Sequence, residues 1–173
     1  GLIPLLETAL GIENAYQIAK ADPRVKAIFL GAEDLSSDLQ AIRSKENHEI
    51  LYARGRVVMA ARAAGVDCYD TPFTDVNDDE GLAQDAAFAR AIGFTGKAVI
   101  SPRHVPAVNE AFSPSDKDIA YAREVMAVIE EGERMGRGAV SLRGKMIDKP
   151  IVDRARRVLE AAEALGLGGY EHE

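Results

Sequence analysis

Acidic side chains follow three of the short apolar runs in this sequence, and their positions point to metal chemistry. The acids after these runs are, in chain order, Glu7, Glu33, Asp34 and Asp70. If the runs are parallel strands, their carboxyl ends meet at one edge of a sheet, where ligands bind in α/β folds. Two carboxylates that converge there can hold Mg²⁺, with water and substrate oxygens as the other ligands. The structural alternatives are that these acids cap helices or pair with arginines at the edge.

The turn Gly31-Ala32-Glu33-Asp34 adds a candidate site for an anion. A glycine lets backbone N–H groups approach a ligand closely, and the start of the helix that follows favours negative charge. We therefore expect the turn to hold a substrate carboxylate next to the metal.

The elements that must position these residues follow a regular order. Four apolar runs, Leu2 to Leu6, Ala27 to Leu30, Val66 to Tyr69 and Lys97 to Ile100, read as strands buried on both faces. Helical patterns over residues 46–64 and 78–92 lie between them, and Gly65 and Gly93 stand where helices end. The run ends are about 30 residues apart, the length of a strand–helix unit. This order predicts four β/α units with a parallel sheet.

The pattern changes after residue 112. A long helix is expected from Ser113 to about Met135, with Ser115 and Asp118 as a capping signal and Gly132 among the glycines that break it. A short strand or extended loop over 139–147 and a last helix over 151–165 follow. We predict two parts, residues 1–112 and a helical C-terminal extension, residues 113–173.

Composition excludes several classes of protein. The 173 residues carry 21 Lys and Arg against 28 Asp and Glu, a net charge of −7, so a nucleic-acid partner is not expected. No apolar run has the ~20 residues that span a bilayer. The single cysteine, Cys68, is expected in a strand core, and a cytoplasmic protein is predicted. Because the chain opens on an apolar run without methionine, we expect it to be part of a longer polypeptide.

Five motifs occur in order along the chain: Pro4-Leu5-Leu6-Glu7-Thr8, Gly31-Ala32-Glu33-Asp34-Leu35, Asp70-Thr71-Pro72-Phe73-Thr74-Asp75, Gly93-Phe94-Thr95-Gly96-Lys97 and Gly144-Lys145-Met146-Ile147-Asp148-Lys149-Pro150. Together they resemble one family, the citrate lyase β-subunit group of CoA-ester lyases within the HpcH/HpaI aldolase superfamily. The resemblance implies the C-terminal half of a (β/α)₈ TIM barrel. It also implies a homo-oligomer, a trimer or hexamer.

The resemblance assigns roles to individual residues. Glu7 and Asp34 match the family's Mg²⁺ ligands, and Ala32, Glu33 and Asp34 match the loop that holds the substrate carboxylate. Asp148 matches the acid that family members insert into a neighbouring subunit's active site, which makes it the candidate catalytic acid or base. From the residues alone, Asp148 is an ordinary N-cap for the last helix.

The implied reaction is a Mg²⁺-dependent carbon–carbon cleavage, or its reverse. A 3-hydroxyacyl-CoA thioester, such as citryl-, malyl- or citramalyl-CoA, would give acetyl-CoA and a 2-oxo acid. One alternative is an aldolase of the same superfamily that acts on free 2-keto acids. Another is a non-catalytic half-barrel module. The 173 residues alone are expected to be inactive, because the first four β/α units of a barrel are not among them.

Overall fold

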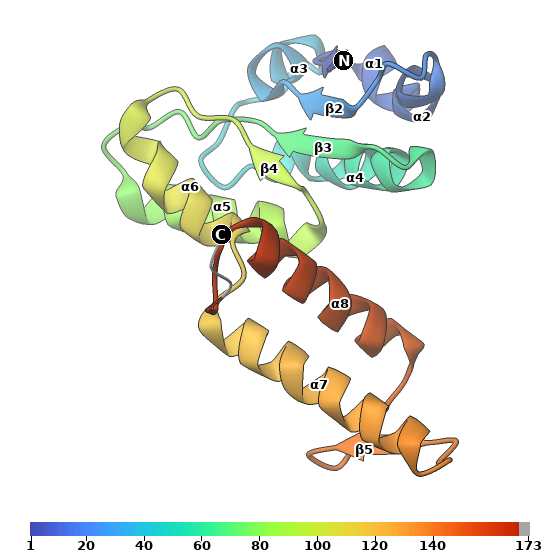
Figure 1. Ribbon diagram of the computed structural model, residues 1–173. Helices are drawn as coiled ribbons and strands as arrows, with labels where there is room; N and C mark the ends of the chain where they lie inside the picture. The colour runs from blue at the N-terminus through green and yellow to red at the C-terminus, as the bar shows by residue number, and fades with distance from the viewer. Residues whose placement is uncertain (170–173) are drawn as a thin grey trace. The chain divides into compact units, whose positions relative to one another are not determined.

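Four parallel strands pair in the order β1-β2-β3-β4 in the N-terminal part of the chain (Figure 1). Their bounds are β1 Leu5–Leu6, β2 Ala27–Leu30, β3 Asp67–Asp70 and β4 Gly96–Lys97. The computed structural model describes residues 1–169, and the strands belong to the first of two units, Gly1–Phe112 and Ser113–Glu173. Strands that pair in chain order are what successive β/α units produce. The predicted α/β class with a parallel sheet is confirmed.

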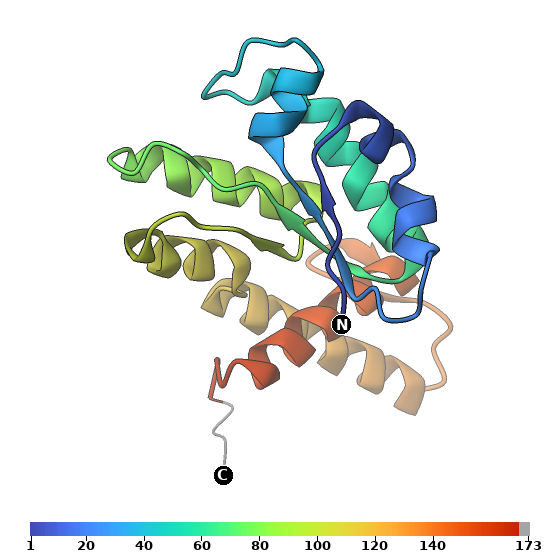
Figure 2. The ribbon, with the colours of Figure 1, turned by 90° about the horizontal axis from the view of Figure 1, so that it is seen from above.

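Helices connect these strands. The helices of the first unit are α1 Ala9–Glu13, α2 Ala15–Lys20, α3 Ala32–Asp38, α4 Leu51–Ala64, α5 Asp79–Ile92 and α6 Val105–Phe112, with 3₁₀ turns η1 His48–Ile50 and η2 Pro102–His104. α2 and α4 lie side by side and pack on the sheet (Figure 2). α4 and α5 end at Gly65 and Gly93, both in the left-handed conformation that closes helices, as predicted.

The two faces of the sheet differ in burial. Ile28, Leu30 and Cys68 point towards the helices and are fully buried in the main core. Leu5 and Phe29 are paired in register on the opposite face, where Leu5 remains 46% exposed. The expectation of strands buried on both faces is therefore wrong for this face, since no described residue covers Leu5 completely.

Some boundaries and one burial prediction are also wrong. The first strand pairs only at Leu5–Leu6, with an isolated bridge from Leu2 to Val25, and the fourth strand ends at Lys97 instead of Ile100. The sequence pattern also predicts His104 on a helix surface, and this prediction is wrong, because His104 is 1% exposed and lies in η2. Pattern alone missed this burial because one histidine in a short 3₁₀ turn defines no helix face.

The second unit is built from two helices and a hairpin. Helix α7 spans Asp116–Arg134, strands β5 Val140–Leu142 and β6 Lys145–Ile147 pair antiparallel, and helix α8 spans Lys149–Ala164 and packs against α7. Ser115 and Asp118 form the predicted capping box at the start of α7. Gly132 does not break α7 as expected, because it lies buried within the last turns of the helix. Within residues 1–169, no helix combines the length and apolarity needed to cross a bilayer.

Candidate metal and substrate site

Glu7 directly follows β1 and lies against Gly31, the residue that follows β2. The Gly31 N–H donates to the Leu6 carbonyl at 2.9 Å, which brings the ends of the two strands together. A Cβ atom on Gly31 would lie 2.9 Å from the Glu7 Cβ and 3.2 Å from its Oε2. The first of these separations is shorter than real Cβ contacts allow, so a glycine is needed there for Glu7 to keep its position.

Two hydrogen bonds hold the backbone just after Glu7. The Thr8 side chain caps α1, since its Oγ1 accepts from the Gly11 N–H at 3.0 Å. The next amide, that of Ala9, donates to Asp38 Oδ2 at 2.7 Å and thereby ties the start of α1 to the last residue of α3. The segment that carries Glu7 is therefore held by β1 on one side and by a capped helix on the other.

Asp34 lies in the first turn of α3, for which Gly31 is the N-cap. The structural alternative that this acid caps a helix is therefore wrong for Asp34, because α3 already begins at Ala32. Residues three apart lie on the same side of a helix, so Asp34 stands one turn above Gly31, against which Glu7 packs. An acid in the first turn also complements the positive end of the helix dipole.

Glu7 and Asp34 differ from the neighbouring acids in their bonding. Among the described residues, no side chain or amide donates a hydrogen bond or forms an ion pair with either carboxylate. The neighbouring acids all have partners: Glu33 pairs with Arg43, Asp38 accepts from Ala9, and Asp75 and Asp78 pair with Lys45. The alternative of a salt bridge for Glu7 at the sheet edge is therefore not observed. Of these acids, the two predicted metal ligands are the ones left to bind a cation.

Asp70, the last residue of β3, is bound by two buried cations, Arg54 and Lys97. Its Oδ1 accepts from Arg54 Nε at 3.0 Å, and its Oδ2 accepts from Arg54 Nη2 at 2.8 Å and from Lys97 Nζ at 2.7 Å. Asp85 on α5 completes the group, 2.8 Å from Arg54 Nη2 and 2.5 Å from Lys97 Nζ. Asp70 thus has the arginine partner that the structural alternative describes and offers no oxygen to a metal.

The pKa values in this cluster follow from its charges. Burial alone raises the pKa of the Asp85 carboxyl, but the charges of Lys97 and Arg54 outweigh burial and hold the pKa below its ordinary value. Burial alone lowers the pKa of the Arg54 guanidinium, and the carboxylates of Asp70 and Asp85 outweigh it in the opposite direction. The opposite charges around them therefore favour the charged forms of the Asp85 carboxyl and the Arg54 guanidinium.

The turn at the start of α3 presents two amides without an intrahelical acceptor. The first N–H groups of a helix have no partner within it, which applies here to Ala32, Glu33 and Asp34. The Ala32 N–H instead donates to Thr71 Oγ1 at 3.2 Å, in a buried position. Of the three residues predicted to hold the substrate carboxylate, Glu33 and Asp34 are those whose amides remain for a ligand.

Asp148 belongs to the second unit and caps α8. Its Oδ1 accepts from the Ile151 N–H at 3.3 Å, and the side chain is exposed. The capping geometry expected from the sequence is therefore present. An exposed cap is also free to exchange its bond to the helix for a bond to another molecule.

The donor set at the strand ends suits a hard cation. Residues 1–169 contain no group of three or more His, Cys, Asp or Glu side chains arranged to hold a metal ion. Mg²⁺ does not need such a group, because it commonly binds through one or two carboxylates while water and substrate oxygens fill its octahedron. Glu7 and Asp34 fit that pattern, whereas a tetrahedral zinc cage would need further nitrogen or sulfur ligands.

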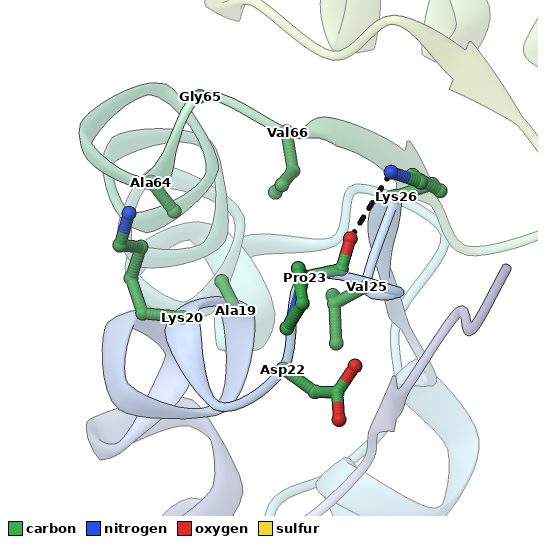
Figure 3. A pocket seen from close by; sticks show the side chains of 9 residues that line it. All are labelled: Ala19, Lys20, Asp22, Pro23, Val25, Lys26, Ala64, Gly65 and Val66. Carbon is green, nitrogen blue, oxygen red and sulfur yellow. Dashed lines mark hydrogen bonds between the residues drawn. The ribbon is translucent and has the colours of Figure 1, made fainter.

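A hollow of about 370 Å³ lies at the amino ends of the strands, opposite the end of the sheet that carries Glu7 and Asp34 (Figure 3). Its lining comes from the segments that lead into β2 and β3, and one rim residue, Lys26, donates from Nζ to the Pro23 carbonyl at 3.0 Å. It contains none of the predicted site residues. Ligand sites of parallel α/β proteins lie at the carboxyl ends of the strands, so this hollow does not compete with Glu7 and Asp34 as the candidate site.

Comparison with known proteins identifies the family of this chain. The model of the family described as HpcH/HpaI aldolase/citrate lyase matches residues 1–102, which hold the sheet, Glu7 and Asp34. The chain belongs to this family. A citrate lyase subunit beta from Leuconostoc mesenteroides subsp. cremoris is 42% identical over 163 residues, which are 94% of this chain and 54% of that protein. The mitochondrial citramalyl-CoA lyase of Homo sapiens is 37% identical, over 95% of this chain and 51% of that protein.

A solved HpcH/HpaI-type structure extends the likeness to three dimensions. The CitE protein of Mycobacterium tuberculosis, crystallised with magnesium, acetoacetate and coenzyme A, matches with a TM-score of 0.79 at 36% identity. The match covers 92% of this chain and 60% of that one. The chain spans about half the length of the curated relatives it matches. Its four strands are part of a TIM-barrel-type fold.

Proposed function

We propose that this chain carries the metal-binding part of a Mg²⁺-dependent carbon–carbon lyase for CoA thioesters of 3-hydroxy acids. The reaction would release acetyl-CoA and a 2-oxo acid, or join them in reverse. The observation that carries the proposal is the pair of carboxylates, Glu7 and Asp34, at adjacent strand ends. Both lack a protein partner among the described residues, while the acids around them are paired. Relatives named as citrate lyase and citramalyl-CoA lyase support the same chemistry.

The residues of the first unit would bind and orient the acid half of the substrate. Mg²⁺ held by Glu7 and Asp34 would act as a Lewis acid towards the oxygen next to the substrate carboxylate. The amides of Glu33 and Asp34 would hold that carboxylate at the start of α3, where the helix dipole favours an anion. The CitE protein of Mycobacterium tuberculosis was crystallised with magnesium and acetoacetate, which supports an oxo acid and Mg²⁺ as ligands of this family.

Asp148 would move the proton in the reaction. In cleavage, the substrate hydroxyl loses its proton as the carbon–carbon bond breaks, and the resulting thioester enolate gains a proton at carbon to give acetyl-CoA. In synthesis, the methyl group of acetyl-CoA loses a proton, and the oxygen of the 2-oxo acid gains one as the bond forms. A carboxylate can act as the base in synthesis and, once it carries the proton, as the acid in cleavage. The exposed position of Asp148 at the start of α8 leaves it able to enter a site built by another subunit.

The metal proposal is tested by Mn²⁺ titration, since Mn²⁺ replaces Mg²⁺ and is observed directly by electron paramagnetic resonance. The protein is the longest natural polypeptide that contains these residues. Glu7→Gln and Asp34→Asn should each weaken Mn²⁺ binding by at least tenfold. Glu33→Gln is the matched control, because the Glu33 carboxylate forms an ion pair with Arg43. This substitution should change the Mn²⁺ affinity by less than threefold. Equal effects of all three substitutions would contradict the assignment.

The activity proposal is tested with citryl-, malyl- and citramalyl-CoA, each with and without EDTA. We expect turnover of one of these thioesters, abolished by EDTA and restored by added Mg²⁺. Turnover of the free acids without CoA would favour the aldolase alternative. Absence of turnover in a full-length protein that binds Mn²⁺ would favour the non-catalytic module.

A further inference from the structure

The buried charge cluster reaches beyond its own four members. Arg54 on α4, Asp70 on β3, Asp85 on α5 and Lys97 on β4 come from four separate elements and carry two positive and two negative charges. All four are buried, and the Lys97 side chain is fully enclosed. A buried pair with a missing partner is costly, so a balanced cluster fixes the relative position of the elements that supply it.

Lys97 also binds Thr71, the residue that follows β3. Besides the two carboxylates, its Nζ donates to the backbone carbonyl of Thr71 at 2.7 Å. Thr71 is buried, with 2% of its surface exposed. The Thr71 carbonyl and the Asp70 carboxylate thus accept hydrogen bonds from the same ammonium group. Thr71 therefore has little freedom to move.

The hydroxyl of Thr71 then reaches the neighbouring strand–helix unit. Its Oγ1 accepts the N–H of Ala32 at 3.2 Å, a contact between residues 39 apart in the chain. The N-cap of α3 is Gly31, which has no side chain with which to cap the helix. Glu7 excludes a side chain at Gly31, as the 2.9 Å contact to a Cβ shows. Thr71, which directly follows β3, therefore supplies a side-chain acceptor to the first N–H group of α3, a helix whose N-cap has no side chain.

We propose that Thr71 is a positioning residue of the metal site: its hydroxyl, held through Lys97, fixes the first turn of α3 and so the Asp34 carboxylate beside Glu7. The inference rests on the proposed metal function of Glu7 and Asp34. Thr71 itself touches neither the metal nor the substrate. Thr71 contributes by orienting Asp34, which lies two residues after Ala32 in the first turn of α3.

Two substitutions separate the hydroxyl from the shape of the side chain. Thr71→Val keeps the shape and removes the acceptor for the Ala32 N–H, whereas Thr71→Ser keeps the acceptor. The matched control is Thr95→Val. Thr95 Oγ1 accepts from the Cys68 N–H at 3.0 Å and donates to the Cys68 carbonyl at 2.9 Å, at the amino end of β4 and away from the candidate site.

Two readouts are measured in the longest natural polypeptide that contains these residues: the Mn²⁺ dissociation constant and hydrogen exchange of the Ala32 amide. Thr71→Val should raise the dissociation constant at least tenfold and speed Ala32 exchange at least tenfold. Thr71→Ser and Thr95→Val should change both by less than threefold, although Thr95→Val lowers the melting temperature. A purely structural role would lower the melting temperature and leave the Mn²⁺ affinity unchanged.

The failures of the two proposals are distinguishable. If the wild-type protein binds no Mn²⁺, the metal function fails, and Ala32 exchange alone decides whether Thr71 fixes the turn. Unchanged Ala32 exchange in Thr71→Val would overturn the positioning role in any case. Wild-type Mn²⁺ affinity in Thr71→Val, or an equal loss in Thr95→Val, would also overturn it.

Discussion

At the scale of single residues, the candidate site depends on which polar groups already have partners. Glu33 and Asp70 look equivalent to Glu7 and Asp34 in the sequence, because all four acids follow apolar runs. Glu33 forms an ion pair with Arg43, and Asp70 forms ion pairs with Arg54 and Lys97. Glu7 and Asp34 accept no hydrogen bond from the described residues. Bonding, rather than residue type, therefore distinguishes the candidate ligands from the structural acids.

Asp148 provides a test at this scale, because capping and catalysis respond to different substitutions. Asn caps helices about as well as Asp, so Asp148→Asn should keep the stability while lowering turnover at least a hundredfold through loss of the titrating group. Asp148→Ala should lower both, with a loss of stability of about 1 kcal/mol. Urea unfolding and thioester turnover are measured for both variants. Full activity in Asp148→Asn would leave Asp148 as a cap only.

Gly31 offers a second residue-scale prediction. Gly31→Ala brings a Cβ atom to within 2.9 Å of the Glu7 Cβ, so Glu7 must move and Mn²⁺ affinity should fall at least tenfold. The matched control is Gly55→Ala in α4, where a Cβ meets nothing within 4 Å. This control should raise the free energy of unfolding by about 0.5 to 1 kcal/mol through helix propensity and leave Mn²⁺ affinity unchanged. A Gly31→Ala variant with wild-type affinity would contradict the close packing of Glu7.

At the scale of elements, the loop between α3 and α4 is held by one arginine. Arg43 Nη1 donates to Glu49 Oε1 at 2.6 Å and to Asn47 Oδ1 at 2.5 Å. Asn47 has a φ of 59°, in the left-handed region, and its amide donates to Asp85 at 2.9 Å. The loop that follows the candidate site is thereby connected to the buried cluster.

This loop should make stability sensitive to acid. Burial raises the pKa of Glu49, but hydrogen bonds from Ser44 and Arg43 outweigh it and lower the pKa from 4.5 to about 2. A carboxyl whose pKa is lower in the folded state stabilises the fold above the unfolded value and loses that contribution as pH falls towards the folded value. Between pH 4.5 and 2 we therefore expect a loss of about 1 to 2 kcal/mol from this group, reduced by solvent screening.

Urea unfolding of Glu49→Gln across this pH range checks the expectation. The variant should be less stable than wild type at pH 7 and should lose less stability on acidification. Glu46→Gln is the control, since Glu46 is exposed and makes no hydrogen bond or ion pair with the described residues. Parallel pH curves for wild type and Glu49→Gln would show that Glu49 does not contribute.

Elements with a strong local signal could be predicted from the sequence, whereas contacts between distant elements could not. The capping box of α7 and the glycines that end α4 and α5 depend on a few adjacent residues and were found. The short α1 and α2 have too few residues for a periodic pattern and were missed. The buried cluster joins four segments and was also missed. Its one signal in the sequence is that Arg54 and Asp85 are charged residues within the apolar stripes of their helices.

At the scale of the whole molecule, the sheet of the first unit is incomplete as a barrel. β1 and β4 each pair with a single neighbouring strand in the described chain, and Leu5 on the uncovered face is 46% exposed. The chain covers only 54% of the Leuconostoc citrate lyase subunit and 51% of the human citramalyl-CoA lyase. Open sheet edges and an exposed apolar face favour association with another chain.

The 173-residue chain expressed alone should therefore dimerise or aggregate and should not turn over thioester substrates. Size-exclusion chromatography with light scattering gives its mass, and the longest natural polypeptide that contains it is the comparison. That polypeptide should form a defined homo-oligomer, the trimer or hexamer expected from the family resemblance. A monodisperse, catalytically active monomer of the 173 residues would contradict this prediction.

The joint role of Glu7 and Asp34 is tested most directly by a crystal structure grown with Mn²⁺ and measured at a wavelength where Mn²⁺ scatters anomalously. We expect one strong anomalous peak at the carboxyl ends of β1 and β2, with an oxygen of Glu7 and an oxygen of Asp34 both about 2.0 to 2.3 Å from it. A peak coordinated by other side chains, or a Mn²⁺-soaked crystal in which these two carboxylates point away from each other, would contradict the proposed metal site.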